Sequence, residues 1–235
     1  MRLASLKMGS VEPEVSIPLI DISPLLSPSP CPASRDAIVC AVRSACEEYG
    51  FFQLIGHGIP LALQREILLC AKRFFALALD QKQELSMSRT LGLSKRGYEA
   101  VGGQKLDHKP DTKGGFYIGF EMDEADPQAG SFLKGPNFWP AALCDEVFRT
   151  PIMEYHAKVL KVHETLLKVL ALGLPYEENV LDALMRDPVA NLKLLHYPPK
   201  QPETGPDDFS LGGECLDHIP RFASCTLSLS GILTI

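Results

Sequence analysis

The spacing of hydrophobic and polar residues along the chain predicts a protein of mixed helices and strands. Apolar residues recur every three or four positions, the spacing of a helix with one buried face, in segments 34–50, 60–78, 150–173 and 176–186. Shorter apolar or alternating runs, which are typical of strands, occupy residues 17–22, 51–56, 116–120 and 191–197. The pattern indicates an α/β protein without internal repeats, and it names no reaction.

Serine, proline and glycine mark the predicted ends of the helices. Ser34 is a typical N-terminal cap for the first helix, and Gly50 is typical of its C-terminal end. Pro60 and Pro151 suit the first turn of two later helices, because proline there loses no needed hydrogen bond. Residues 86–140 contain glycine pairs and little periodicity, so most of this region is predicted to be irregular.

Length and charge exclude several classes of protein. The chain has 235 residues, which suits one domain or a small cap followed by one domain. Its net charge of −6 argues against a nucleic-acid partner, because phosphate binding requires an excess of lysine and arginine. No apolar run approaches the ~20 residues of a membrane-spanning helix, and the N-terminus lacks the hydrophobic stretch of a secretory signal. We therefore expect neither nucleic acid nor membrane as a partner.

The number and spacing of the cysteines indicate the cellular compartment in which the protein works. The chain has seven cysteines, an odd number, and no two of them form a C-x-x-C pair. This predicts a reducing, cytoplasmic location with neither a disulfide framework nor a zinc knuckle. Cys40, Cys46 and Cys70 fall within predicted helices, where a free thiol behaves as a small apolar residue.

A series of short motifs, taken in order, resembles one family of enzymes. The most specific is YGFFQLIGHGIP at residues 49–60, and its companions are IPLIDISPL, RGYEAVGGQKLD, DTKGGFYIGFE, GPNFWP, LALGLP and LKLLHYPP. Over about residues 17–211 the chain resembles the isopenicillin N synthase-like non-haem iron oxygenases. These form a branch of the 2-oxoglutarate/Fe(II) dioxygenase superfamily.

The resemblance implies a fold of the α/β (α+β) class with three parts. These are an N-terminal α/β cap, a long helix, and an incomplete double-stranded β-helix of the jelly-roll kind. We accordingly expect a disordered N-terminus at residues 1–16 and the non-haem dioxygenase N-terminal domain at 17–140. The start of the Fe(II)/2-oxoglutarate core would follow at 141–212, and an aberrant tail at 213–235.

The resemblance also implies a small organic substrate, with Fe(II) and 2-oxoglutarate as cofactors of the full-length enzymes. In that family two histidines and one carboxylate bind the iron, the first pair as His-x-Asp just after the strand that contains HYPP. An Arg-x-Ser further along holds the oxoacid. Tyr197 matches a family tyrosine that contacts the oxoacid near iron; an aromatic residue that closes a barrel strand is the alternative interpretation.

The iron-binding motif itself does not occur in this sequence. None of the six histidines has an aspartate or glutamate two positions later, and no Arg-x-Ser is present. We therefore predict no catalytic residue and no metal ligand, and expect neither cofactor to bind this chain tightly. The 235-residue form is expected to be truncated or intron-retaining and catalytically incompetent.

Other combinations of histidine and carboxylate are less suited to a metal. His156 and His163 lie seven positions apart on one predicted helix, ~10 Å along its axis, which exceeds the reach of one ion. His57 lies in a predicted turn, where a structural role is favoured. Asp107, His108 and Asp111 lie in a segment that is predicted to be irregular. Asp217 and His218 are adjacent in the sequence, so their side chains could not readily bind one ion from a regular strand.

Residues 213–235 differ in character from what precedes them. Gly213-Glu214-Cys215 is what GGTGAGTGC would encode, and this contains a common splice-donor sequence, so we hypothesise that the tail is translated intron. Genomic DNA that continues as one exon through codon 235, without that hexamer, would contradict this. The segment FASCTLSLSGILTI has neither charge nor proline, so it is expected to aggregate or to add one strand to the remaining sheet.

Three functional interpretations stay open from the sequence. The first is an oxygenase-family chain without catalysis, and the second is a working Fe(II) oxidoreductase with unrecognised ligands. The third is a non-enzymatic binding or regulatory module made of the N-terminal cap. The missing His-x-Asp favours the first.

Overall fold

The computed structural model describes residues 16–103, 105–106, 109–110, 113–198, 226–227 and 233–234. The helices in these residues are α1 (Pro32–Glu48), α2 (Leu61–Phe75), α3 (Leu79–Glu84), α4 (Arg149–Gly173) and α5 (Asp182–Arg186). The strands are β1 (Leu19–Asp21), β2 (Gln53–Ile55), β3 (Gly97–Glu99), β4 (Lys105–Leu106), β5 (Lys109–Pro110), β6 (Gly114–Ile118), β7 (Leu192–His196), β8 (Thr226–Leu227) and β9 (Leu233–Thr234). Short 3₁₀ helices are η1 (Ser23–Leu26), η2 (Met87–Arg89) and η3 (Asp145–Val147).

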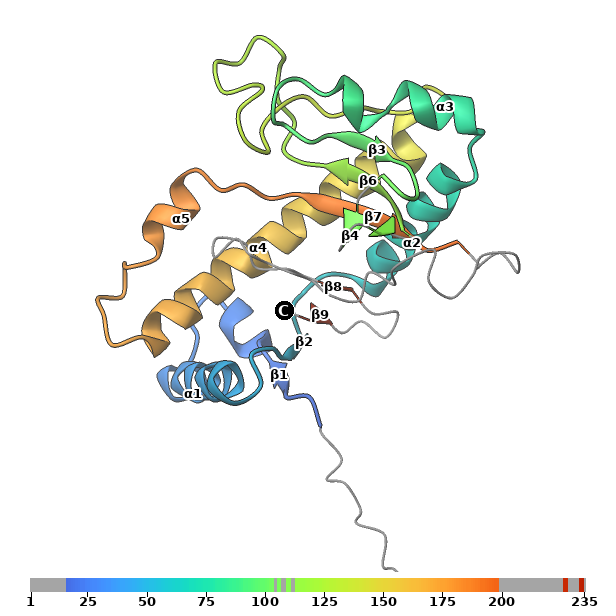
Figure 1. Cartoon of the computed structure of the whole chain (residues 1–235). Coiled ribbons are helices and arrows are strands. Elements are labelled where there is room, and N and C mark those ends of the chain that lie inside the picture. The colour runs from blue at the N-terminus through green and yellow to red at the C-terminus, as the bar shows by residue number, and fades with distance from the viewer. Residues whose placement is uncertain are drawn as a thin grey trace, which may run out of the picture.

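The long helix α4 crosses the molecule and joins its two halves (Figure 1). One end of α4 packs against α1, which lies beside β1 and β2. Its other half packs against α2 and lies behind the sheet of β3, β6 and β7. This mixture of helices and strands confirms the predicted α/β class. No helix among the described residues combines the length and the apolar character that a membrane crossing requires.

The first sheet is built on a parallel pair. β1 and β2 run in the same direction, with Ile20 opposite Leu54, and both side chains are buried. Parallel neighbours need a long crossover, and α1 provides it. On the far side of β2, the backbone of β9 pairs antiparallel with Gln53 and Leu54, and β8 pairs with β9. The end of the chain therefore adds two strands, β9 and β8, to the sheet of β1 and β2, whereas the sequence predicted one strand on the remaining sheet of the core.

The helix boundaries differ from the sequence pattern by a few residues: α2 begins at Leu61, with Pro60 as its N-cap, and ends at Phe75, and α4 begins at Arg149. α1 begins at Pro32, so Ser34 lies inside its first turn and the prediction of Ser34 as the cap is wrong. Proline suits this position because its missing N–H would have no intrahelical partner. Gly50 does follow the end of α1, with a φ of +77° and its N–H donated to the carbonyl of Ala45 at 3.1 Å. The long helix is confirmed to end at Gly173.

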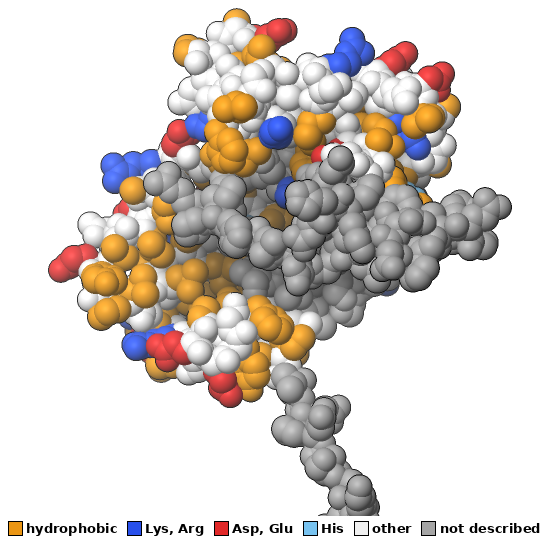
Figure 2. Space-filling model, in the orientation of Figure 1, with side chains coloured by type: hydrophobic (Ala, Val, Ile, Leu, Met, Phe, Trp, Pro, Cys, Tyr) orange, Lys and Arg blue, Asp and Glu red, His pale blue; other side chains and the backbone are white. Residues whose placement is uncertain are grey.

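The segment between α4 and β7 is less helical than predicted. Within the predicted helix 176–186, only α5 forms. A short helix is stable mainly when one of its faces packs against the rest of the protein, and α5 has no buried residue. Four large apolar side chains in this connection are exposed, and Figure 2 shows hydrophobic side chains gathered there: Leu174, Tyr176, Val180 and Leu184. α3 and β3 were not predicted, because each is too short to show a periodic pattern.

The second sheet is antiparallel and has the order β3-β6-β7. β6 lies in the middle, with Phe116 opposite Tyr98 on one side and opposite Leu194 on the other. These three side chains are buried and face α2, where the ring of Phe74 lies 4.1 Å from that of Phe116, centroid to centroid. Burial of such aromatic groups stabilises the fold by roughly 25 cal/mol per Å² of apolar surface. Edge-to-face and stacked contacts between the rings add to this stabilisation.

The five described cysteines are free thiols: Cys31, Cys40, Cys46, Cys70 and Cys144. Cys70 is buried in α2, as expected of a small apolar residue, and burial raises the pKa of its thiol to about 11. Cys40 and Cys46 are exposed on α1, so they do not serve as apolar core residues. They lie beside the buried positions of that helix, which are Ile38, Val42 and Ala45.

Candidate functional site

The side of the second sheet that faces away from α2 carries its polar side chains. Successive residues of a strand point to opposite faces, so Tyr98, Phe116 and Leu194 enter the core while their neighbours point the other way. Those neighbours include Glu99 on β3, Tyr117 on β6 and Lys193 on β7. We call these three residues the polar face.

The three residues of the polar face contact one another in a row. Tyr117 lies directly opposite Lys193 in the register of β6 and β7. The Tyr117 hydroxyl donates a hydrogen bond of 2.8 Å to Oε2 of Glu99, and Nζ of Lys193 lies 5.4 Å from the centre of the Tyr117 ring. That distance is within the range of a cation–π contact. Tyr117 is buried, Glu99 is half-buried and Lys193 is exposed.

The polar face can recognise a small molecule more readily than it can perform chemistry. Lys193 forms no salt bridge with the described residues, so its ammonium group is available for an anionic or hydrogen-bond-accepting oxygen. The ring of Tyr117 lies beside that ammonium but is itself buried, and Glu99 accepts the hydrogen bond of the Tyr117 hydroxyl. The resulting site would orient an acidic oxygen at Lys193.

The residue matched to the family's oxoacid contact lies next to this face. Tyr197 directly follows β7 and is 53% exposed. Continued alternation of the strand would place it on the same side as Lys193, whereas His196 lies on the core side and stacks on Phe75 at 5.0 Å. The expected contact between Tyr197 and an oxoacid stays a prediction.

The histidines of α4 have structural partners. His156 is buried, and its Nε2 lies 3.0 Å from the carbonyl oxygen of Ala190, to which a neutral ring donates. Burial lowers the pKa of His156, and the positive charge of Arg96 adds to this, while the bond to Ala190 acts in the opposite direction. Nδ1 of His163 lies 3.3 Å from the carbonyl of Val159, one turn earlier in the same helix.

The remaining candidate residues do not form a metal centre in the described structure. His57 is buried in its turn and its Nδ1 accepts the N–H of Ile59 at 3.2 Å, a structural contact of the kind expected for a turn residue. Among the described residues no three histidine, cysteine, aspartate or glutamate side chains could hold one metal ion. These residues therefore do not fit an Fe(II) site. The other candidates lie outside the described residues: Asp107, His108, Asp111, Asp217 and His218.

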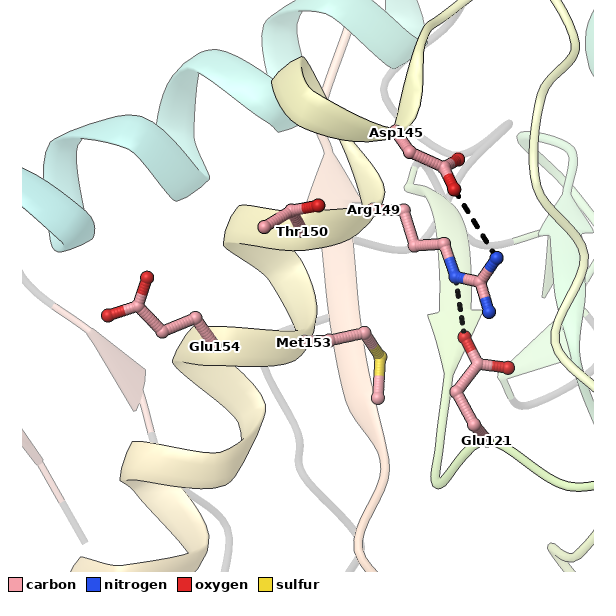
Figure 3. Close-up of a pocket in the computed structure, with 6 residues that line it drawn as sticks. All are labelled: Glu121, Asp145, Arg149, Thr150, Met153 and Glu154. Carbon is pink, nitrogen blue, oxygen red and sulfur yellow. Dashed lines mark hydrogen bonds and ion pairs between the residues drawn. The ribbon is translucent and has the colours of Figure 1, made fainter.

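A second surface feature is an open hollow of about 550 Å³ beside the start of α4 (Figure 3). Arg149 crosses it, with Nε 3.1 Å from Oε1 of Glu121 and Nη1 3.4 Å from Oδ2 of Asp145. The guanidinium also lies 5.5 Å from the centre of the Trp139 ring. Because its cation is already matched by two carboxylates, this hollow is less suited to an anionic ligand than the polar face. Its other lining residues are Thr150, Met153 and Glu154.

Comparison with known families decides the ancestry of this fold. A family model described as "non-haem dioxygenase in morphine synthesis N-terminal" matches residues 17–142. The chain belongs to this non-haem dioxygenase family. Its membership in the 2-oxoglutarate/Fe(II) superfamily, expected from the motifs, is confirmed by curated relatives and by solved structures.

Two curated relatives of the chain are named as 2-oxoglutarate-dependent dioxygenases. The chain is 44% identical to eupC of a Phoma species over 193 residues, which are 79% of this chain and 61% of that protein. It is 41% identical to tropC of Talaromyces stipitatus over 202 residues, 83% of this chain and 62% of that protein. The chain thus spans less than two thirds of the length of these members of the family.

Solved structures of the family share the fold. A full-length protein of Neurospora crassa, solved in complex with alpha-KG, is 26% identical and superimposes with a TM-score of 0.63 over 77% of this chain and 54% of that chain. A putative 2OG-Fe(II) oxygenase family protein from Caulobacter crescentus, 22% identical, gives a TM-score of 0.64 over 79% and 57% of the two chains. The helices and sheets described above therefore share the fold of solved members of the 2-oxoglutarate oxygenase family.

Proposed function

We propose that this chain forms the cap and the opening sheet of a 2-oxoglutarate-dependent oxygenase that acts on a small organic molecule. The polar face carries the proposal, together with the family. One face of the β3-β6-β7 sheet is buried against α2, so a ligand can reach the sheet only from the side of Lys193. The proposed division into a domain at 17–140 and the start of the core at 141–212 places the polar face across both parts.

The chemistry of the polar face suggests the class of substrate. An ammonium group beside an aromatic ring favours a planar compound with a carboxylate, an enolate or an acidic phenol. The Glu99 carboxylate, through the Tyr117 hydroxyl, keeps the ring in place and disfavours a second negative charge at that end. We therefore propose an aromatic or conjugated acid, bound with its acidic oxygen at Lys193.

Cofactor binding by this chain is proposed to be weak. Tyr197 is proposed to contact 2-oxoglutarate, but one phenol hydrogen bond contributes only about 1 kcal/mol, far less than a useful affinity requires. The described residues provide no set of ligands for Fe(II), and the sequence contains no His-x-Asp. We accordingly propose that residues 1–235 alone do not hold iron stoichiometrically and do not turn over the oxoacid.

The substrate class can be tested with a charged probe and its neutral analogue. We expect salicylate to shift the NMR signals of Lys193 and its neighbours in a saturable manner, and salicylamide to shift them much less. Lys193→Met should abolish the salicylate response, whereas Lys161→Met, at an exposed position of α4, should leave it unchanged. An equal response to both probes, or an unchanged response in Lys193→Met, would contradict the proposed role of Lys193.

A second candidate function is a non-enzymatic binding module. The exposed apolar side chains of the connection between α4 and β7 favour this function. One of them, Leu174, also lines a groove of about 190 Å³ between α1 and α4. Monomeric proteins expose few contiguous apolar patches of this kind. Self-association in light scattering that is removed by Leu184→Glu would support this function. A monodisperse monomer that retains no partner would argue against it.

We also propose that the protein works in a reducing compartment such as the cytoplasm. The free thiols of Cys31, Cys40, Cys46 and Cys144 are exposed, and such thiols persist where glutathione keeps them reduced. Fractionation of cells that express a tagged chain would test this, and recovery from a secreted or membrane fraction would contradict it.

A further inference from the structure

A single buried guanidinium connects the segments that surround the start of β7. Arg96 lies immediately before β3 and is 1% exposed. Its Nη1 donates hydrogen bonds of 2.9 Å to the carbonyl of Ser94 and to Oδ1 of Asn191, and its Nη2 donates one of 2.7 Å to the carbonyl of Leu133. Asn191 is the last residue before β7. The side chain of Arg96 therefore reaches across the sheet, from one edge strand to the other.

Two backbone features show that the surrounding chain is shaped around Arg96. Leu133 has a φ of +59°, a left-handed conformation that leucine rarely adopts, and it is the residue whose carbonyl accepts from Arg96. Gly119, just after β6, lies so close to the guanidinium that any side chain there would collide with it. Gly119 is fixed in turn by Asn137, whose amide side chain bonds both its N–H and its carbonyl, at 2.8 and 2.9 Å.

The charge of Arg96 is held by neutral oxygens. It forms no salt bridge with the described residues, its Nε has no partner among them, and burial lowers its pKa to about 10, which still leaves it charged at neutral pH. On the helix side of the sheet, His156 bonds the carbonyl of Ala190, the residue before Asn191. The start of β7 is thus held at two consecutive residues by side chains from different elements.

We propose that Arg96 is a positioning residue for the polar face: by fixing Asn191, it sets where β7 lies against β6 and so holds Lys193 over the ring of Tyr117. Lys193 follows Asn191 by two positions, and the first paired residue of β7, Leu192, lies opposite Ile118. The relevance of this arrangement to a substrate rests on the proposed function, but the arrangement itself can be tested without a substrate. The alternative is that the hydrogen bonds of the sheet position β7 alone and Arg96 adds only stability.

A spectroscopic signal of Lys193 distinguishes these two cases. Reductive methylation with ¹³C-formaldehyde labels lysine amines and keeps their charge, and Lys193→Arg identifies the Lys193 signal by its loss. Because Nζ lies over the Tyr117 ring, we expect this signal to be shifted upfield in the unaltered chain, and Tyr117→Leu to remove the shift. Arg96→Gln and the milder Asn191→Ala should both return the signal to the position of solvated lysines.

A matched control separates positioning from stability. Arg73→Gln removes another partly buried guanidinium, which donates to the carbonyl of Val147 at 2.8 Å and anchors α2 rather than β7. We expect this variant to lower the unfolding midpoint in urea and to keep the upfield Lys193 signal. Retention of the shift in folded Arg96→Gln, or in Asn191→Ala should Arg96→Gln fail to fold, would overturn the proposal. Failure of salicylate to bind would overturn the proposed substrate class and leave this result standing.

Discussion

At the scale of single residues, the buried side chains around the start of β7 oppose any additional positive charge. Arg96 is already a cation there, and its acceptors are the neutral oxygens of Ser94, Leu133 and Asn191. Protonation of His156 would add a second cation close to the first, in a place where burial already disfavours the charged imidazole. The neutral ring, which donates to Ala190, is therefore the form that belongs to the folded protein.

His156 makes stability depend on pH in a defined direction. Its pKa is lower in the folded chain than the ordinary value of 6.5, so the unfolded chain binds the proton more readily. The contribution of neutral His156 is fully present above pH 6.5 and is lost as the pH falls from 6.5 toward the folded pKa. Urea unfolding between about pH 7.5 and 5 should show a fall in stability that is smaller in His156→Gln. An equal slope for the two proteins would contradict this.

Gly97 illustrates a residue whose replacement is costly for two separate reasons. Its φ is +93°, and a Cβ would also collide with the carbonyl oxygen of Leu85, which is backbone and cannot easily move. Gly50 has a similar φ of +77° with open space around it. We expect Gly97→Ala to lower the free energy of unfolding by about 2–4 kcal/mol, and Gly50→Ala by about 1 kcal/mol. Equal losses in urea titrations would show that the collision is relieved.

The sequence could not reveal the role of Arg96. In the motif SKRGY it resembles a surface residue, and its partner Asn191 lies 95 positions away along the chain. The polar face was missed for a similar reason. The alternation of FYI and LKL shows that Tyr117 and Lys193 each point away from buried neighbours, but only the register of β6 and β7 shows that they meet.

At the scale of elements, one aromatic side chain of α2 holds the second sheet against the start of α4. Phe74 is fully buried and contacts Tyr98 on β3, Phe116 on β6 and Phe148 at the start of α4. The long amphipathic helices were predictable because their buried positions repeat over several turns. Their partners were not, because a strand of three residues such as β3 has no measurable period.

Phe74→Ala should therefore destabilise several elements together. We expect a loss of about 3–5 kcal/mol in the free energy of unfolding, because a large cavity would open between α2, α4 and the second sheet. Leu69→Ala in the same helix is the control, since Leu69 is 42% exposed and should cost less than about 1 kcal/mol. The midpoint and slope of guanidinium unfolding measure both. A small effect of Phe74→Ala would mean that the site collapses around the cavity.

At the scale of the whole molecule, the sequence and the fold identify the family, but the described residues do not provide the iron ligands of that family. The ordered motifs of residues 17–211 predicted the superfamily, because they encode turns and buried strands that the fold requires at fixed places. The described residues build the long helix α4, its neighbouring helices and three sheets, and they include no set of side chains that fits iron. The part that the chain shares with its relatives covers only 61% and 62% of their length, so a large part of each relative has no counterpart in the match.

An anaerobic titration of the purified 235-residue chain with Fe(II) and 2-oxoglutarate tests this account most directly. The readouts are the weak metal-to-ligand charge-transfer absorption and the iron that stays with the protein through gel filtration. We expect neither the absorption band nor stoichiometric iron. One tightly held iron per chain that develops the band when the oxoacid is added would contradict it.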